Sequence, residues 1–351
     1  AHDPHHQPEA DLQDKGLSHN AVGLLGGTVL GISSVAPAYA LTATIGILVA
    51  EAGAKMPVVI IAGFLPMFFA AYAYRELNKV APDCGTSFTW TTKAFGPYVG
   101  WIGGWAAILA TVIVLSNLAG VAVQFFYQFF GDLLGNEDLG TLWQNKLVNV
   151  ITCLIFLAVA TRVAYRGITT TEKVQFVLVG FQLALLLIFA LVALVKAGDS
   201  ATGLSFSFDW FSPSGLTLSA FVAGLSGSIF AFWGWDVCLT MTEETKNGEK
   251  TSGMAAALTA VGVLAIYLVG SIATVMFAGV GDTGLGLRNP ENSANVFTAI
   301  ATPVMGPFAI LLSLAVLSSC AASLQSTMIS PARSLLAISH HGALPKRFGS
   351  V

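Results

Sequence analysis

The stretch Phe230-Ala231-Phe232-Trp233-Gly234-Trp235-Asp236 lies inside an apolar segment, 216–241, that contains no other carboxylate than Asp236. The segment is long enough to cross a bilayer, which takes about 20 residues. Gly234 weakens the helix locally, and a charge at membrane depth costs at least about 2.5 kcal/mol on insertion scales. Broken backbone in lipid persists only where protein or a polar cavity surrounds it. The stretch therefore predicts a broken helix with a small-molecule site near the midplane. The alternative is a glycine kink with Asp236 hydrogen-bonded to a neighbouring helix.

The composition is that of an integral membrane protein. Of the 351 residues, 55% are hydrophobic and only 10% are charged, whereas soluble domains carry about 25% charged residues. The sequence has 36 glycines, as expected where helices approach closely in lipid. No basic patch, nucleic-acid motif, H-E-x-x-H or G-x-S-x-G is present. We therefore expect neither a nucleic-acid partner nor an enzyme, and we expect no cofactor.

The N-terminal residues 1–20 are polar and have no apolar run, so we expect a disordered cytoplasmic tail and no signal peptide. His2, His5 and His6 lie in this tail, and a disordered tail is favoured over a metal site. The four cysteines form no CxxC pair, and three of them lie in apolar segments, where cysteine behaves as a small hydrophobe. We predict no disulfide and no metal site. The cysteines are Cys84, Cys153, Cys238 and Cys320.

Eight apolar segments of helical length predict an all-α membrane protein. Their continuous hydrophobicity excludes the ten-residue alternation of membrane barrels. The expected organisation is a tail at 1–20, a first repeat at 21–198 and an incomplete second repeat at 199–351. The segments are 21–50, 57–80, 98–130, 147–163, 174–195, 216–241, 255–280 and 304–329.

The basic residues of the loops predict the orientation. With the N-terminus in the cytoplasm, 12 of the 16 Lys and Arg residues fall on the inner side. This asymmetry is what the positive-inside rule expects for a multi-pass protein of the cytoplasmic membrane. The four on the outer side are Lys55, Lys146, Lys196 and Arg288.

The first segment is as irregular as the sixth. It contains Gly26-Gly27-Thr28-Val29-Leu30-Gly31-Ile32-Ser33-Ser34-Val35-Ala36-Pro37, and the proline frees a carbonyl about one turn earlier. Taken alone, a simple proline kink is equally acceptable. Segments one and six, however, lie five spans apart and enter from opposite sides. Paired interruptions at matching places in two inverted halves are the best sequence indication of a transport site.

Few other polar groups lie inside the spans. Each of them alone is best explained as a hydrogen-bonding contact between helices, but together they could line a cavity with segments one and six. They are Ser116, Asn117, Gln182, Ser318, Ser319 and Ser323.

Three motifs carry a family resemblance. Cys84-Gly85-Thr86-Ser87-Phe88 is followed by Phe95-Gly96-Pro97 and then by Gly100-Trp101-Ile102-Gly103-Gly104-Trp105. Phe232-Trp233-Gly234-Trp235-Asp236 is followed by Glu243-Glu244-Thr245-Lys246-Asn247, and Ala332-Arg333-Ser334 by Gly342-Ala343-Leu344-Pro345. In this order the motifs resemble those of the amino acid–polyamine–organocation (APC) permeases.

The resemblance implies a LeuT-type fold of two inverted five-helix repeats, with substrate held between broken helices one and six. Backbone at Ile32, Ser33, Ser34, Val35 and Ala36 would meet a carboxylate, and backbone at Phe230, Ala231 and Phe232 an amine. Trp233, Gly234, Asp236 and Asn117 complete the candidate substrate site. Phe230 and Trp235 are the candidate gating aromatics. Candidates for coupling to H⁺ or Na⁺ are Asp236, Gln182, Ser318 and Ser319.

The chain departs from the family pattern in three places. Ser33-Ser34-Val35-Ala36-Pro37 replaces a Gly-Ser-Gly-type break. By rough alignment, Gln182 stands where some proton-coupled relatives carry a lysine. Only about eight spans are present, so we expect a fragment that lacks helices nine and ten.

The sequence thus favours a secondary transporter for an amino acid or organic amine, with Asp236 favouring a cationic or amine-bearing substrate. The alternative is a substrate-gated sensor or channel on the same scaffold, which the lack of a charge ring or filter-like repeat disfavours. The charged loop 243–250 is best explained as a solvated turn, and a gating pair with Arg75 or Arg333 is the weaker interpretation.

Overall fold

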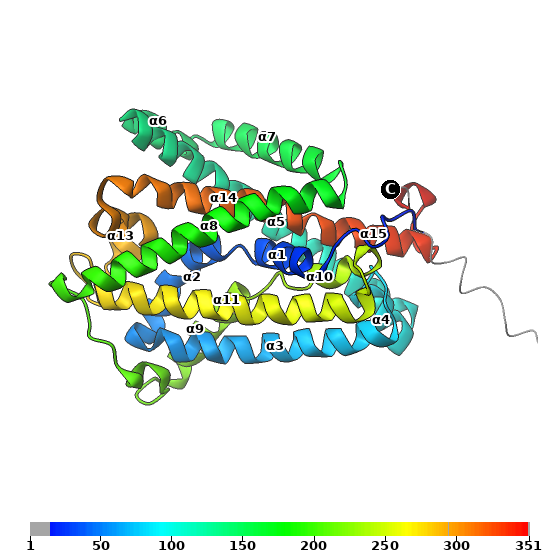
Figure 1. Ribbon diagram of the computed structural model, residues 1–351, viewed down its shortest axis with the longest axis horizontal. Coiled ribbons are helices and arrows are strands. Elements are labelled where there is room, and N and C mark those ends of the chain that lie inside the picture. The colour runs from blue at the N-terminus through cyan, green and yellow to red at the C-terminus, as the bar shows by residue number, and fades with distance from the viewer. Residues whose placement is uncertain (1–14, 294, 350–351) are drawn as a thin grey trace, which may run out of the picture.

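The computed structural model describes residues 15–293 and 295–349, and within them the chain is almost entirely helical (Figure 1). His2, His5 and His6 lie outside the described residues. The longer helices are α1 (Leu24–Val35), α2 (Pro37–Ala52), α3 (Met56–Val80), α4 (Ser87–Phe95), α5 (Pro97–Leu134), α7 (Lys146–Ala164), α8 (Ile168–Lys196), α9 (Leu218–Ala231), α11 (Gly248–Ala278), α13 (Val296–Met305), α14 (Ile310–Thr327) and α15 (Ile329–His340). Short turns of helix are α6 (Glu137–Gly140), α10 (Val237–Thr240), α12 (Pro290–Ser293), η1 (Gly53–Lys55), η2 (Leu142–Gln144), η3 (Ala197–Asp199), η4 (Phe208–Phe211), η5 (Thr242–Glu244), η6 (Gly306–Phe308) and η7 (Lys346–Phe348).

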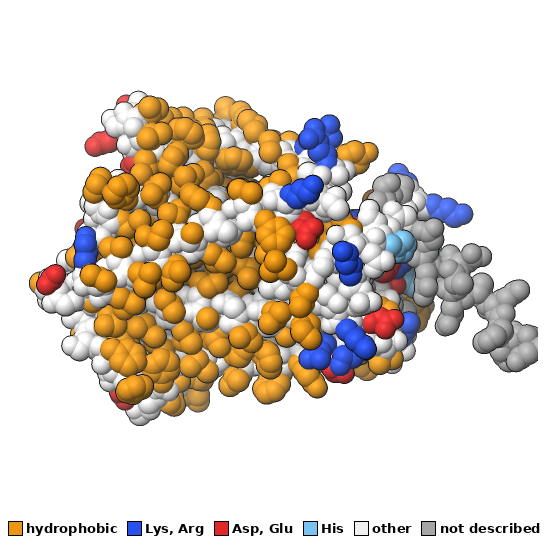
Figure 2. Space-filling model, in the orientation of Figure 1, with side chains coloured by type: hydrophobic (Ala, Val, Ile, Leu, Met, Phe, Trp, Pro, Cys, Tyr) orange, Lys and Arg blue, Asp and Glu red, His pale blue; other side chains and the backbone are white. Residues whose placement is uncertain are grey.

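Most of the predicted segments are long helices that could cross a membrane. Figure 2 shows hydrophobic side chains over the middle of the molecule, with Lys and Arg gathered at the end that carries the N-terminal residues. We call this the N-terminal end and the other the distal end. Two shorter apolar helices, Leu218–Ala231 and Val296–Phe308, accompany the long ones. The six long apolar stretches are Leu24–Val80, Pro97–Leu134, Lys146–Ala164, Ile168–Asp199, Gly248–Ala278 and Ile310–His340.

The eighth predicted segment begins later than the hydropathy pattern suggested. Residues 304 and 305 end α13, and the chain turns at Gly306, whose φ is 58°, before α14 begins at Ile310. Because apolar residues continue through the turn, hydrophobicity alone does not reveal the boundary.

Pro37 separates α1 from α2. It has no N–H to donate to the Ser33 carbonyl, which instead accepts a 3.1 Å hydrogen bond from the Ala36 N–H. Ala36 adopts the left-handed conformation, with φ 56° and ψ 67°. Such a conformation is uncommon for a residue with a Cβ and persists when the surroundings impose it. The first segment is therefore two half-helices rather than a kinked rod.

A turn at residues 232–236 separates α9 from α10. Gly234 lies in this turn with φ 127°, a conformation that favours glycine. A Cβ at this position would lie 2.7 Å from the Val35 nitrogen and 2.8 Å from the Ser34 carbonyl carbon. The glycine therefore allows the backbone of the second break to touch the backbone of the first.

The two breaks form the centre of the molecule. The α1–α2 pair and the α9–α10 pair run in opposite directions, with α2 packed on α9 and α1 on α10 (Figure 1). Helices α3, α8, α11 and α14 pack around them, and α5 is joined to α2 by the hydrogen bond between Tyr39 and Asn117. Both interruptions predicted from the sequence are present and adjacent, in the arrangement expected of inverted repeats.

Candidate functional site

A cavity lies where the two breaks meet. Its free volume is about 40 Å³, which is room for a few water molecules and less than an amino acid needs. One wall carries hydroxyl groups and the other carries two aromatic rings and a carboxylate. The residues that line it are Ser34, Val35, Ala36, Tyr39, Ala40, Thr111, Val114, Leu118, Phe230, Trp233, Gly234, Asp236, Val237, Ser323, Thr327 and Ser330.

The broken helices place opposite partial charges at this cavity. Ala36, the N-cap of the 16-residue helix α2, lines it, and a helix N-terminus attracts negative groups through its partial positive charge. Pro37 has no N–H, and the N–H groups of Ala36 and Tyr39 are already hydrogen-bonded. Phe230, in the last turn of α9, lines the same cavity, and a helix C-terminus attracts positive groups. The cavity thus has a positive and a negative pole built from main chain.

Asp236 strengthens the negative pole. It is partly exposed to the cavity and, within the described residues, forms no ion pair with any Lys, Arg or His. A carboxylate in a low-dielectric setting is stable only with a partner or a proton. The site is therefore chemically suited to a cationic group brought by a ligand.

Seven of the candidate substrate-site residues line the cavity and the others lie behind it. Ile32 and Ser33 cap the last turn of α1 by accepting hydrogen bonds from the Ala36 N–H. Asn117 accepts a 2.5 Å hydrogen bond from the hydroxyl of Tyr39, which itself lines the cavity. The seven that line the cavity are Ser34, Val35, Ala36, Phe230, Trp233, Gly234 and Asp236.

The two other residues of the second break point into packed protein. The Ala231 carbonyl accepts a 2.6 Å hydrogen bond from the Tyr267 hydroxyl. The Phe232 ring packs against Tyr267 and Phe64, at centroid distances of 5.1 and 5.7 Å. These contacts hold the end of α9 against α3 and α11.

The two candidate gating aromatics differ in their surroundings. Phe230 lines the cavity and is 44% exposed, so its ring is free to move. Trp235 is buried, and its ring packs edge-on against Tyr74, which packs in the same way on Trp90. Of the two, only Phe230 can cover a ligand without unpacking this stack.

A second glutamine on α8, Gln175, lies seven residues before Gln182 and contacts the first break, which Gln182 does not. Gln175 accepts a 2.5 Å hydrogen bond from the Ser33 hydroxyl and donates to the Ala322 carbonyl and the Gln325 side chain. Gln182 is fully buried, and neither of its amide atoms has a hydrogen-bond partner. The junction of α1, α8 and α14 is therefore held by a neutral amide.

The serines of α14 lie along the first break. Ser319 accepts a 3.3 Å hydrogen bond from the Tyr39 N–H, whereas Ser318 donates to the Ala315 carbonyl within its own helix. Ser323 donates to the Ser34 carbonyl. Ser323 is recognisable in the sequence as a polar residue inside a span, whereas Tyr39, Thr111, Thr327 and Ser330 join the cavity lining without having been predicted. The signal for Thr327 was its spacing, four residues after Ser323 on the same helix face.

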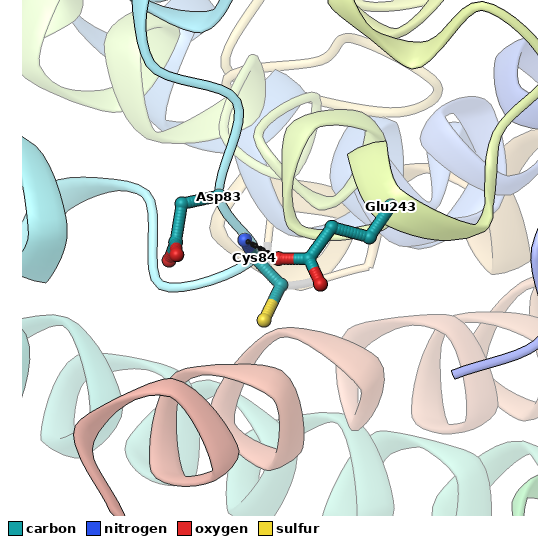
Figure 3. Close-up of side chains that lie close together, drawn as sticks. All are labelled: Asp83, Cys84 and Glu243. Atoms are coloured by element: carbon teal, nitrogen blue, oxygen red, sulfur yellow. Dashed lines mark hydrogen bonds between the residues drawn. The ribbon is translucent and has the colours of Figure 1, made fainter. Parts of the chain in front are cut away.

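At the N-terminal end, three groups that could ligate a metal lie together (Figure 3). The ligand atoms of Asp83, Cys84 and Glu243 are all within 4.8 Å of one another. The Lys15 ammonium, however, lies among them, 2.7 Å from an Asp83 oxygen, 2.6 Å from a Glu243 oxygen and 3.6 Å from the Cys84 sulfur. The lysine thus supplies the cationic charge that this cluster needs.

Electrostatics stabilise this arrangement. Burial opposes the charge on Lys15, but the neighbouring Cys84, Asp83 and Glu243 raise its pKa above the ordinary value. Burial also opposes the charge on Asp83, but hydrogen bonds and the Lys15 charge hold its pKa well below the usual range. Burial raises the pKa of the Cys84 thiol, so the thiol stays neutral and unreactive.

Residues 15–22, which we call the N-terminal strap, continue this contact along the backbone. Ala21 and Val22 donate to the Glu244 carbonyl, and Lys246 donates to the Val22 carbonyl. The side chain of Glu244 receives two 2.9 Å hydrogen bonds from Arg333 at the start of α15. The loop 243–250 is thus paired with Arg333 rather than fully solvated, whereas Arg75 lies 3.9 Å from Glu76.

Comparison with known proteins shows the family to which the chain belongs. The amino acid permease family model matches residues 20–351. The chain belongs to the amino acid permease family. Family members and matched relatives are transporters rather than enzymes.

The matched relatives of this chain are distant and longer. A branched-chain amino acid permease of Lactococcus lactis is 24% identical over 81% of the chain and 60% of its own length. A glutamate/serine transporter of Bacillus subtilis is 26% identical over 66% and 41%. A D-serine/D-alanine/glycine transporter of Escherichia coli is 28% identical over 84% and 60%. The chain thus spans about half the length of these relatives.

Proposed function

We propose that the protein carries an amino acid, or an organic amine of similar size, across the cytoplasmic membrane by alternating access. The observation that carries the proposal is the cavity at which α2 begins and α9 ends. Its positive pole suits a carboxylate, and its negative pole with Asp236 suits an ammonium. A zwitterionic amino acid would satisfy both poles at once, and it would provide the cation that Asp236 lacks.

The small volume of the cavity fits one stage of such a cycle. Since about 40 Å³ is too small for an amino acid, the helices around it must separate to admit one. The N-terminal strap, with Lys15 and the Glu244–Arg333 pair, ties α1, the loop before α4, and α15 together at the end that we assign to the cytoplasm. Opening toward the cytoplasm would therefore break these ion pairs, and Phe230 would cover the ligand from the other side.

The coupling ion is proposed to be a proton or sodium. Asp236 would carry a proton if the substrate brings no cation of its own. Ser319 and Ser323 lie beside carbonyls and amides of the first break, where a sodium ion would find oxygen ligands. Gln182 and Ser318 have weaker claims, since the first is buried away from any polar partner and the second is bonded within α14.

The test is uptake by proteoliposomes against a panel of amino acids and polyamines, with and without sodium and a pH gradient. Asp236→Asn keeps the shape of the side chain and removes its charge, so uptake of amine-bearing substrates should fall at least about a hundredfold, from the loss of a buried charge pair. Wild-type protein should also show counterflow of labelled substrate, which distinguishes a transporter from a channel. Unchanged uptake by the variant would remove Asp236 from the mechanism.

A further inference from the structure

A second polar cavity lies at the distal end, outside the site described above. Its volume is about 410 Å³, within the range of small-molecule sites. It lies between the end of α2, the turn η1, the chain before α9, and the loop after α11. Apolar residues Leu216, Ala220 and Val280 form part of its wall.

Three charged side chains line this cavity, and two of them have no ion-pair partner among the described residues. The Lys55 ammonium is 3.0 Å from an Asp209 oxygen and also donates to the Ser214 hydroxyl. Glu51 forms neither a salt bridge nor a side-chain hydrogen bond, and Arg288 donates only through Nε, to the Val49 carbonyl. An unpaired anion and an unpaired cation thus line one cavity without pairing with each other.

The same two helices, α2 and α9, line both the distal cavity and the central one. Along α2, Ala40 lines the central cavity and Glu51 the distal one. Along α9, Phe230 lines the central cavity and Ala220 the distal one. At a rise of 1.5 Å per residue, both helices place the cavities roughly 15 Å apart. The same pair of half-helices therefore joins the distal cavity to the breaks.

We propose that the distal cavity is a second site for free zwitterionic amino acids, with Glu51 binding the α-ammonium and Arg288 the α-carboxylate. Lys55 is already paired with Asp209, so the charges available to a ligand are one negative, on Glu51, and one positive, on Arg288. This pair of opposite charges suits a zwitterion better than an anion or a cation alone. A guanidinium matches the geometry of a carboxylate. The apolar wall accommodates the side chain. The inference depends on the proposed function only for the choice of amino acids as ligands.

The experiment is equilibrium binding of labelled L-alanine to the purified full chain in lipid nanodiscs. L-alanine carries both charged groups and a minimal side chain. We expect two sites in the wild type and one each in Glu51→Gln, Arg288→Gln and Asp236→Asn. Asp282→Asn is the matched control, because it removes an exposed carboxylate from the same loop without touching the cavity, and it should keep two sites. Propylamine and propionate, which each lack one charge, should compete at least about tenfold more weakly.

The outcomes separate this proposal from the transport proposal. Binding that survives Asp236→Asn and disappears in Glu51→Gln supports the distal site whatever the central cavity does. A single site that Asp236→Asn abolishes and Glu51→Gln leaves intact would overturn the distal site and leave transport standing. Absence of any wild-type binding up to about 10 mM L-alanine, well above a weak Kd of about 1 mM, would also overturn it.

A labelling experiment covers the case in which a charge variant does not fold. Ala220→Cys places a thiol in the distal cavity of a Cys153→Ser background, where the three remaining native cysteines are buried. L-alanine should slow modification of the new thiol at least about threefold at saturation, because the bound ligand would cover it. Equal rates with and without L-alanine would contradict the proposal.

Discussion

Two buried glutamines on α8, seven positions apart, differ in whether their amide groups have hydrogen-bond partners. Gln175 has partners for both ends of its amide, on α1 and α14, whereas Gln182 is equally buried with no partner for either atom. The net value of a hydrogen bond is about 1 kcal/mol, but stranding a buried partner costs about 1–3 kcal/mol. The two positions should therefore respond oppositely to loss of the amide.

We predict that Gln175→Leu lowers the free energy of unfolding by about 2 kcal/mol, because it removes hydrogen bonds to Ser33, Ala322 and Gln325. The Ser33 hydroxyl and the Ala322 carbonyl keep their hydrogen bonds to Ser326, but the Gln325 oxygen loses its partner. Gln182→Leu is the matched control and should be neutral or stabilising, since it replaces two unpaired polar atoms with apolar ones. The measurement is the thermal midpoint of each variant in detergent. Equal losses in both variants would show that the contacts of Gln175 contribute nothing particular.

Residue-scale detail was the least predictable part of the site. The sequence identifies Asp236 as an isolated carboxylate in an apolar segment, and the structure places it at the cavity. The sequence does not reveal which way Trp235 points, because the contact of its ring with Tyr74 comes from packing against another helix. Nor does it choose between Gln175 and Gln182, since residues seven apart face the same side of a helix.

At the scale of elements, the two breaks depend on local chemistry and on each other. Pro37 and Gly234 are visible in the sequence as helix breakers, which is why both interruptions could be predicted. Their contact could not, because it depends on a Cβ-free approach of Gly234 to the backbone of Ser34 and Val35. The end of α13 at Met305 was likewise hidden, because apolar residues run on through the following turn.

Gly234→Ala tests this contact. The added Cβ would lie within 3 Å of backbone atoms of the first break, and alanine is strained at φ 127°. We predict a loss of about 2 kcal/mol in stability or a displaced break, with uptake reduced at least about tenfold. Gly180→Ala on α8 is the control: no atom lies within 4 Å of its Cβ, and alanine favours helix by about 1 kcal/mol. A Gly234→Ala protein with wild-type uptake would show that the breaks need not touch.

At the scale of the whole molecule, the two ends differ in how tightly they are held. The N-terminal end is held by the strap and its buried ion pairs, whereas the distal end has a wide cavity with unpaired charges. This difference suits a protein that opens at one end while the other is closed. The sequence predicts only that basic residues are unequally divided, with 12 on one side and 4 on the other. It does not predict the ion pairs at one end or the cavity at the other.

Lys15→Ala should open the N-terminal end. Removing the ammonium leaves Asp83 and Glu243 facing each other beside Cys84, and like charges repel. Loss of the Lys15 charge by itself disfavours the Cys84 thiolate, so any faster reaction must come from exposure. We predict that undocking of the strap exposes the Cys84 thiol, which is buried in the wild type, and that it reacts with a maleimide at least about tenfold faster in the variant. Lys346→Ala, an exposed lysine near the same end, should leave the rate unchanged. A protected Cys84 in Lys15→Ala would mean that the strap does not depend on this ion pair.

The same ion pair predicts a pH range for strap docking. Because the pKa of Asp83 is lowered on folding, its stabilisation is complete above the unfolded value near 3.8 and is lost as pH falls through the folded value. Because the pKa of Lys15 is raised, its stabilisation is complete below 10.5 and is lost as pH rises beyond that. Asp83 also lies 3.7 Å from His341, and a histidine side chain ordinarily changes charge near pH 6.5. Hydrogen exchange at the Val22 and Lys246 amides, corrected for intrinsic rates, should therefore be constant only between about pH 8 and pH 9. A strong change within that range would show that another group controls docking.

The poles of the central cavity come from the peptide backbone, and this affects how such a protein can diverge. No point mutation deletes a peptide dipole, so under the proposed function the backbone share of the attraction for the part that every amino acid has in common does not depend on side chains. The Asp236 carboxylate adds to that attraction and can be lost by mutation, whereas substitutions of the hydroxyl and aromatic groups around it would change the contacts with the part in which amino acids differ. Related proteins with this arrangement could therefore change their preferred amino acid through a few substitutions in the lining while the backbone contribution to binding the shared ammonium and carboxylate groups is kept.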